Sequence, residues 1–180
     1  MSVLKLEKSE TLPEESLQTL ELVKKKFGFV PNLMKVFAQS PVALKSYLAV
    51  ADLFDTSTFT PTERQLVLLS VSHENRCEYC TAVHSTIAKQ MIKVEPKLVD
   101  ELRNGKPLSN PKYDALVTFT KLLIKERGFV SEEAAQKFQA AGYNQQNILE
   151  VVTAIGLKTI SNYVNHLAKT PIDSAFIGEK

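Results

Sequence analysis

The sequence predicts an all-α protein built as one domain. Segments between prolines and glycines repeat their apolar residues with a period of about 3.6 residues, as amphipathic helices do, and alternating β-branched runs are few. The chain has 180 residues, of which 44% are hydrophobic, so it is long enough to bury one sizeable core. Nothing in the composition marks a second core, and we therefore expect a single domain over residues 1–180.

Capping and stop residues place the expected helices along the chain. Ser40 before Pro41, and Thr60 with Glu63 at capping-box spacing, are typical helix starts. Gly28 is typical of a helix end because glycine readily takes the left-handed conformation. On these signals the helices cover about 14–27, 33–38, 41–55, 61–75, 77–91, 96–103, 111–127, 132–141 and 145–167.

The charge balance and the N-terminal residues indicate a soluble protein. The 22 basic and 20 acidic residues nearly cancel, and there is no basic block beyond residues 24–26, so electrostatics indicates neither nucleic acid nor an anionic membrane as a partner. Residues 1–8 are charged throughout and lack the apolar core of a signal peptide, and no apolar run approaches the ~18 residues of a membrane span. We expect a cytoplasmic location.

Residues 72–89 carry the side chains best suited to chemistry. They include both cysteines of the chain, Cys77 and Cys80, and His84 follows four residues later. On a helix these three side chains share one face. Thiolates form readily at a helix start or beside a histidine, where the pKa of a cysteine falls from about 8.5 to about 3.5–7.5. Cysteines this close enclose too short a loop to be a good structural staple, so they indicate a redox or a metal site.

Other interpretations of these residues stay open. The cysteines could be small buried hydrophobes on a helix. They could also bind zinc together with His84 and a distant His73 or His166. His84 alone could be a half-buried helix residue with backbone partners, although its position over the turn of Cys80 would let it accept the thiol proton.

The pattern C-x-x-C-x-x-x-H in residues 77–84 resembles the signature of the AhpD-like alkylhydroperoxidases in the carboxymuconolactone decarboxylase superfamily. Residues 27–32 (FGFVPN), 162–166 (NYVNH) and 170–173 (TPID) are similar to peroxidase-related members of that superfamily, so the resemblance covers most of the chain. It implies an AhpD-like fold of about eight to ten helices, with the thiol pair at the start of a central helix. It also implies homo-oligomers, commonly trimers or hexamers.

The resemblance implies a proton relay in which a glutamate, a water and His84 deprotonate the second cysteine. Cys80 then attacks a peroxide and Cys77 resolves the product. The family's glutamate lies twelve residues before the first cysteine, where this sequence has Gln65, and an amide cannot take a proton at neutral pH. Glu74, three residues before Cys77, is our expected replacement for the missing carboxylate, with a solvated interhelical acid as the alternative.

Besides Gln65, three other residues are possible accessories of the thiols. His73 could tune them electrostatically, although a histidine in a turn is ordinarily just exposed. Tyr79 lies on a different helix face from the cysteines, which favours packing, with lining of the substrate entrance as the alternative. His166, together with Asn162 and Asn165, either pairs with the thiol helix or packs between helices.

These residues predict a thiol-dependent alkyl hydroperoxide reductase with an antioxidant role. Cys80 becomes a sulfenic acid, Cys77 condenses with it to a disulfide, and an external dithiol or protein reductant restores both thiols. The scheme requires no metal, flavin or nucleotide, and the sequence has no glycine-rich phosphate loop. A dithiol/disulfide exchange protein that meets peroxide only incidentally and a zinc-stapled helical scaffold are the alternatives. Lactone decarboxylation is disfavoured, because superfamily members with that activity lack the cysteine pair.

Overall fold

The chain folds into packed helices, as the sequence predicts. The structure, a computed structural model, describes residues 2–5 and 9–179. Within those residues there are nine α-helices, one π-helical segment and two short 3-10 helices, and no strand. The helices are η1 (Ser9–Thr11), α1 (Glu14–Phe27), α2 (Asn32–Phe37), α3 (Pro41–Phe54), α4 (Pro61–Glu74), α5 (Glu78–Thr86), η2 (Ile87–Ile92, the π-helix), α6 (Pro96–Arg103), α7 (Pro111–Lys125), α8 (Glu132–Ala140), α9 (Gln145–Ala168) and η3 (Ser174–Glu179).

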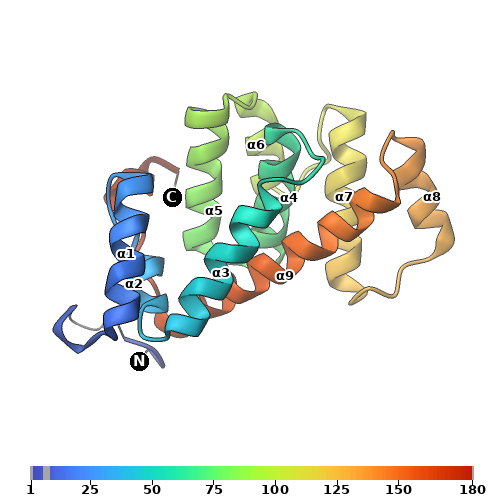
Figure 1. Ribbon diagram of the computed structural model, residues 1–180. Helices are drawn as coiled ribbons and strands as arrows, with labels where there is room; N and C mark the ends of the chain where they lie inside the picture. Colours follow the sequence, from blue (N-terminus) through green and yellow to red (C-terminus); the bar gives the residue numbers. More distant parts are fainter. Residues whose placement is uncertain (1, 6–8, 180) are drawn as a thin grey trace.

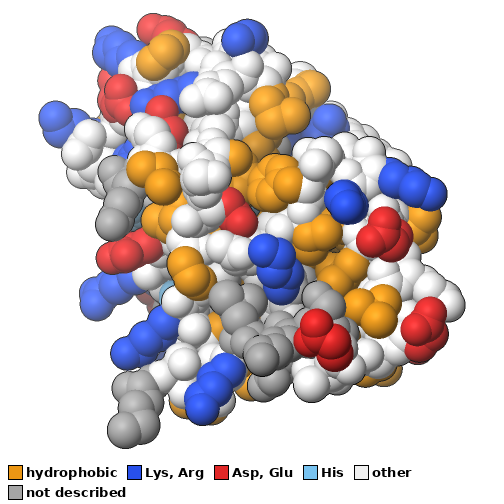
Figure 2. Space-filling model, turned by 90° about the vertical axis from the view of Figure 1, so that its left-hand side faces the viewer, with side chains coloured by type: hydrophobic (Ala, Val, Ile, Leu, Met, Phe, Trp, Pro, Cys, Tyr) orange, Lys and Arg blue, Asp and Glu red, His pale blue; other side chains and the backbone are white. Residues whose placement is uncertain are grey.

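The long helix α9 connects the two ends of the molecule. Figure 1 shows α1 and α2 at one end and α7 and α8 at the other, with α9 running diagonally between them. α4 packs against α5, α7 and α9, and α3 packs along α9. At the α1 end, hydrophobic side chains lie among charges of both signs, so this face has no patch of a single charge (Figure 2). No helix of the described part combines the length and the apolar character that crossing a bilayer requires.

The helix starts that the sequence predicts are confirmed. The Ser40 hydroxyl accepts the N–H of Ala43, and Thr60 and Glu63 form a complete capping box at the start of α4. Gly28 ends α1 in the left-handed conformation, with a φ of 81°. Boundaries elsewhere agree to within about two residues, which is the ordinary uncertainty of a helix end.

The helix that carries the cysteines differs from the expectation. We expected it to run unbroken to about Met91, but α5 ends at Thr86 and continues as the π-helix. The hydroxyl of Thr86 donates to the carbonyl of Ala82 at 3.0 Å, which offers that carbonyl a second partner just where the helix widens. Short π-helical segments within helices are frequent at functional sites.

The cysteines belong to one of three hydrophobic clusters. Cys77 and Cys80 pack with buried side chains of α1, α2 and α3, among them Leu33, Phe37 and Leu44. A second cluster joins α3, α4, α7, α8 and α9, and a third joins α4, α6 and α7. The thiol pair is therefore held by side chains from elements far from it in the sequence.

Candidate active site

A tight turn between α4 and α5 holds the two cysteines at the start of a helix. α4 ends at Glu74, and Arg76 takes a left-handed conformation with a φ of 55°. The N–H of Cys77 donates to the carbonyl of Ser72 at 2.9 Å, which closes the turn. Cys77 is the N-cap of α5 and Cys80 lies in its first turn, where unpaired backbone N–H groups favour a negative charge. The expected position of the thiol pair is confirmed.

Side chains of α9 surround the two sulfur atoms. Cys77 and Cys80 are 1% and 2% exposed, and both are free thiols. Asn165 directs its Nδ2 toward both, at 3.2 Å from the Sγ of Cys80 and 3.8 Å from the Sγ of Cys77. The Oγ of Ser161 lies 3.9 Å from the Sγ of Cys80. The closer amide and the additional hydroxyl both favour a negative charge on Cys80 over one on Cys77.

The same helix brings a buried lysine to the site. Lys158 is 1% exposed and precedes Ser161 by three residues, so the two side chains share one helix face. Its Nζ lies 2.9 Å from the Nε2 of His84. In the described part of the chain, the acidic groups that act on it most are Cys80, Tyr47 and Cys77, and none of these groups is a carboxylate.

The ring nitrogens of His84 have different partners, which fixes its tautomer. An ammonium can only donate, so Nε2 accepts the hydrogen bond from Lys158. Nδ1 therefore carries the proton and donates to the Oε1 of Gln65 at 3.0 Å. Gln65 thus contacts the histidine that the resemblance assigns to the relay. It orients this ring but cannot take a proton from it.

The surroundings separate the pKa values of the two thiols. A hydrogen bond from the Cys77 thiol lowers the pKa of Cys80 well below its usual value, although burial opposes this. The Lys158 ammonium and the Ser161 hydroxyl act in the same direction. The pKa of Cys77 is raised, because its thiol donates a hydrogen bond to Cys80 and because it is buried. Cys80 is therefore the thiolate of the pair, and Cys77 keeps its proton.

The two basic groups are shifted in opposite directions. Burial and the neighbouring charge of Lys158 lower the pKa of His84 well below its usual value, so the ring is neutral at physiological pH. Burial alone would lower the pKa of Lys158 as well, but the negative charge of Cys80 outweighs it and the net shift is upward. The reduced site thus holds an ammonium, a thiolate and a neutral imidazole.

A cavity of about 620 Å³ gives access to these groups. Cys80, His84 and Lys158 line it, so a substrate inside can meet the thiolate although little of the thiolate reaches the outer surface. Most of the remaining wall is apolar, and it includes Phe27, Phe29, Met34, Tyr47, Leu48, Phe54, Leu157 and Phe176. Such a cavity suits a substrate with an apolar body.

Tyr79 both packs in the core and lines the cavity. It is 5% exposed, and its hydroxyl donates to the Oδ2 of Asp173 at 2.6 Å. The same carboxylate accepts the N–H of Asn32 at the start of α2, at 3.1 Å from Oδ1. These hydrogen bonds join α2 and the C-terminal segment to the thiol helix. They give a structural reason for the motifs at residues 27–32, 77–84 and 170–173 to occur in one chain.

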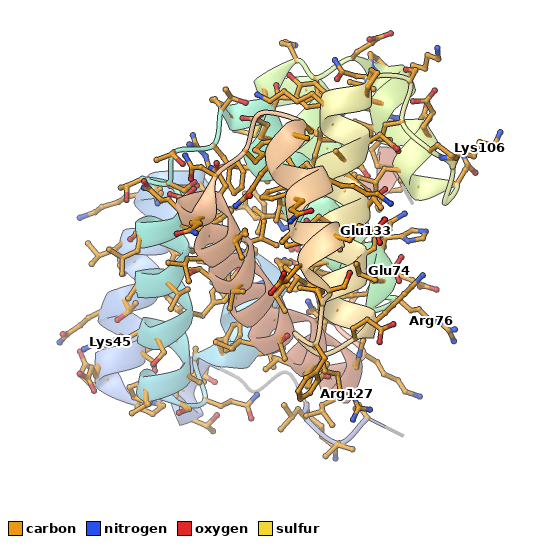
Figure 3. All side chains as sticks on the ribbon, turned by 90° about the vertical axis from the view of Figure 1, so that its right-hand side faces the viewer. Lys45, Glu74, Arg76, Lys106, Arg127 and Glu133 are labelled. Carbon is orange, nitrogen blue, oxygen red and sulfur yellow. The ribbon has the colours of Figure 1, made fainter. Side chains whose placement is uncertain are left out.

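The structure does not bring Glu74 to His84, so the position expected for it is corrected. Its carboxylate lies 4.0 Å from the Nζ of Lys121 and 3.9 Å from the Nζ of Lys125, both on α7, and Figure 3 shows it on that side of the molecule. Glu74 follows Gln65 by nine residues, which is about 180° of rotation along a helix. Its side chain therefore points away from the face that meets α5.

His73 and His166 also lie apart from the thiols. The Nδ1 of His73 is 3.9 Å from Glu74, and His73 lines a separate open pocket. His166 is exposed, with its ring near that of Tyr163. Within residues 2–5 and 9–179, no three His, Cys, Asp or Glu side chains are grouped as a metal site requires, so the ligand set considered for zinc is not assembled there.

Our sequence reasoning missed Lys158, Ser161 and Tyr47. A signal for the first two was present, because Val151, Ala154, Lys158 and Ser161 recur at spacings of three and four residues on one face of the predicted helix. A lysine in an otherwise apolar stripe is unusual, since lysine is almost never fully buried unless it is paired. Tyr47 gave no such signal, because an aromatic residue on a helix ordinarily packs in the core.

A family comparison supports the assignment of the thiol segment. Residues 43–109 match the model of the Carboxymuconolactone decarboxylase family, and this segment contains both cysteines and His84. A comparison with curated proteins found no match.

The fold is shared with several solved structures. The alkylhydroperoxidase AhpD core of a peroxidase-related protein from Ralstonia eutropha JMP134 is 22% identical with a TM-score of 0.85, and the match covers 97% of this chain and 94% of that one. A peroxidase-related protein from Silicibacter sp. TM1040 is 22% identical with a TM-score of 0.83, covering 99% and 95%. The debrominase Bmp8, in a complex with 2,3,4-tribromopyrrole, is 16% identical with a TM-score of 0.75, covering 98% and 94%.

Proposed function

We propose that this chain, whose residues 43–109 match the Carboxymuconolactone decarboxylase family, is a thiol-dependent peroxidase that reduces organic hydroperoxides. The observation that carries the proposal is the Cys80 thiolate on the wall of an apolar cavity, with the Cys77 thiol beside it. A nucleophile, its resolving partner and room for a substrate are thus adjacent.

The proposed cycle uses both cysteines in turn. The Sγ of Cys80 attacks one peroxide oxygen, the O–O bond breaks, and the substrate leaves as an alcohol. Cys80 is then a sulfenic acid. The thiol of Cys77 attacks that sulfur, water leaves, and a disulfide forms. An external dithiol supplies the two electrons that restore the site. The identity of this reductant and the homo-oligomeric state stay predictions from the resemblance.

The walls of the cavity favour an organic hydroperoxide over hydrogen peroxide. Hydrogen peroxide would leave the apolar side chains of a 620 Å³ cavity without a partner. An alkyl or aryl group that buries about 100 Å² of apolar surface there contributes about 2.5 kcal/mol. This is a difference of roughly 70-fold in kcat/KM if the contact is kept in the transition state.

The burial of both sulfurs disfavours exchange with folded protein partners as the main role. A disulfide is exchanged only when the attacking thiolate contacts one of its sulfurs, and Cys77 and Cys80 are 1% and 2% exposed. A thiol on the surface of a folded partner would have to enter the cavity to reach them, whereas a small peroxide fits into it.

Reductive dehalogenation of an aromatic compound is a second candidate function. It is favoured by the aromatic side chains in the cavity wall and by the fold shared with the debrominase Bmp8. Replacement of an aromatic halogen by hydrogen consumes two thiols and yields a disulfide and a hydrogen halide. The reaction would therefore use the same thiol pair as peroxide reduction.

A mass measurement separates these functions. The reduced protein is treated with one equivalent of cumene hydroperoxide, hydrogen peroxide or a brominated pyrrole. We expect cumene hydroperoxide to remove two hydrogens from the peptide that contains Cys77 and Cys80 and to yield its alcohol faster than hydrogen peroxide reacts. Thiols that persist with both peroxides, together with bromide release from the pyrrole, would replace the first function by the second.

A further inference from the structure

Lys158 is enclosed by groups that can balance its charge in only one redox state. His84 and the two cysteines face it from the region of α5, and Tyr47 faces it from α3. Burial raises the pKa of Tyr47, so its phenol is neutral at physiological pH. The imidazole is neutral as well. The compensating anion is therefore the thiolate of Cys80.

Oxidation removes that anion. In the disulfide state the ammonium would lie next to a neutral imidazole, a neutral phenol and two uncharged sulfur atoms, and it would still be buried. An uncompensated buried charge is so costly that the group gives up its proton instead. The protonation state of Lys158 is thereby coupled to the redox state of the thiol pair.

His84 cannot hold this proton in place of Lys158. A proton added to its Nε2 would make a buried imidazolium, a charge no better compensated than the ammonium. The proton could not pass on through Nδ1 either, because Nδ1–H donates to the Oε1 of Gln65 and an amide oxygen does not take a proton at neutral pH. The relay that the resemblance implies ends at a carboxylate, but the corresponding chain of hydrogen bonds here ends at an amide. Apart from the proton of the Cys77 thiol, the proton that can leave the site therefore lies on the Nζ of Lys158.

We propose that Lys158 is a catalytic residue that protonates the leaving alkoxide and remains neutral while Cys77 and Cys80 form the disulfide. The Cys80 sulfur forms a bond to one peroxide oxygen, the O–O bond breaks, and the alkoxide takes a proton from Nζ. Cys77 then attacks the Cys80 sulfur, the S–O bond breaks, and the Cys77 proton leaves with the hydroxide as water. The external dithiol returns two electrons and two protons, one to Cys77 and one to Lys158. The alkoxide step rests on the proposed peroxidase function.

The proton balance distinguishes this role from a purely structural one. The reduced site holds two protons that can leave, one on Cys77 and one on Lys158. Diamide oxidises the thiol pair to a disulfide and takes up two protons as it is reduced. If Cys77 and Lys158 each supply one of these protons, no proton is taken from the solution. If Lys158 only holds a charge, the solution must supply about one proton for each disulfide.

The test measures this uptake with a pH dye in weak buffer. The full-length reduced protein receives one equivalent of diamide at a pH where its absorbance at about 240 nm shows that the Cys80 thiolate has formed completely. We expect no net uptake by the wild type. We expect about one proton per disulfide for Lys158→Arg, since a guanidinium keeps its charge at any accessible pH. Uptake of about one proton by the wild type would overturn the proposal, whether or not the arginine variant folds.

A kinetic measurement tests the alkoxide step separately. Lys158→Arg that retains the thiolate absorbance should react with cumene hydroperoxide roughly 10²- to 10⁴-fold more slowly, as expected for loss of a general acid. Lys125→Arg, a change at an exposed lysine of α7, is the control and should react at the wild-type rate. A rate for Lys158→Arg equal to that of this control would overturn the step. If the wild type does not react with peroxides, the proposed function and the alkoxide step are refuted. If the same protein takes up no proton when diamide oxidises it, the coupling between the protonation of Lys158 and the redox state of the thiols is still supported.

Discussion

Replacement of Asn165 by leucine should destabilise the Cys80 thiolate more than it destabilises the folded protein. The Nδ2 of Asn165 lies 3.2 Å from the Sγ of Cys80. A hydrogen bond to a charged group contributes about 1.5–3 kcal/mol, and about 1.36 kcal/mol corresponds to one pKa unit. Its loss should therefore raise the pKa of Cys80 by roughly 1–2 units. The fold should lose less stability, because the Oδ1 of Asn165 is buried without a hydrogen-bond partner among the described residues, and leucine removes it.

The assay is the rate at which iodoacetamide alkylates Cys80 as a function of pH, measured by the mass of its peptide. The midpoint of this profile should move upward by about 1–2 pH units in Asn165→Leu. Asn162→Leu is the matched control, since Asn162 is buried on the same helix but bonds to Asn75 and not to sulfur. A midpoint for Asn165→Leu that differs from the wild type no more than that of Asn162→Leu would refute the reasoning.

Three further changes test neighbouring parts of the account. Gln65→Glu places a carboxylate about 3.0 Å from the Nδ1 of His84, and NMR titration should show the imidazole pKa raised by about 1–3 units; an unchanged pKa would contradict the geometry. Glu74→Gln should leave the alkylation profile of the thiols unchanged, and a shift in its midpoint would place this carboxylate in the relay after all. Burial alone would raise the pKa of Glu63, but hydrogen bonds to its carboxylate, led by that from Lys112, hold it below its usual value. The stability that this carboxylate contributes is therefore present above a pH of about 4.5 and is lost as the pH falls through the lowered pKa. Glu63→Gln should reduce the free energy of unfolding in urea by about 1–3 kcal/mol at neutral pH and by progressively less as the pH falls through the lowered pKa, and a loss that stays the same down to acid unfolding would be inconsistent with an ionised Glu63.

Features set by local interactions could be predicted from the sequence. The start of α4 follows from Thr60 and Glu63, which satisfy backbone N–H groups within four residues of each other. The end of α1 follows from Gly28, whose left-handed conformation needs no distant partner. The turn before Cys77 is equally local. For this reason the first half of the site, two thiols at a helix start, was predicted correctly in position.

The second half of the site depends on contacts between elements far apart in the sequence. Lys158 meets His84 only because α9 crosses α5, and the spacing of residues along one helix does not specify that crossing. Glu74 was misplaced for a related reason. We considered its distance from Cys77 along the chain, whereas its direction is set by its rotation around α4 relative to Gln65. The charged partner of His84 is Lys158 and not the carboxylate that the relay would use. A search of the sequence for a carboxylate therefore could not find it.

Trapping of the sulfenic acid tests most directly whether Cys80 is the peroxide-reactive thiolate. In Cys77→Ser the resolving thiol is absent, but the serine hydroxyl can still donate to Cys80. This variant, treated with cumene hydroperoxide and dimedone, should carry one dimedone adduct, located on Cys80. Cys80→Ser should carry none, and its Cys77 thiol should remain reduced. An adduct on Cys77 in the second variant, or an unmodified Cys80 in the first, would contradict the account.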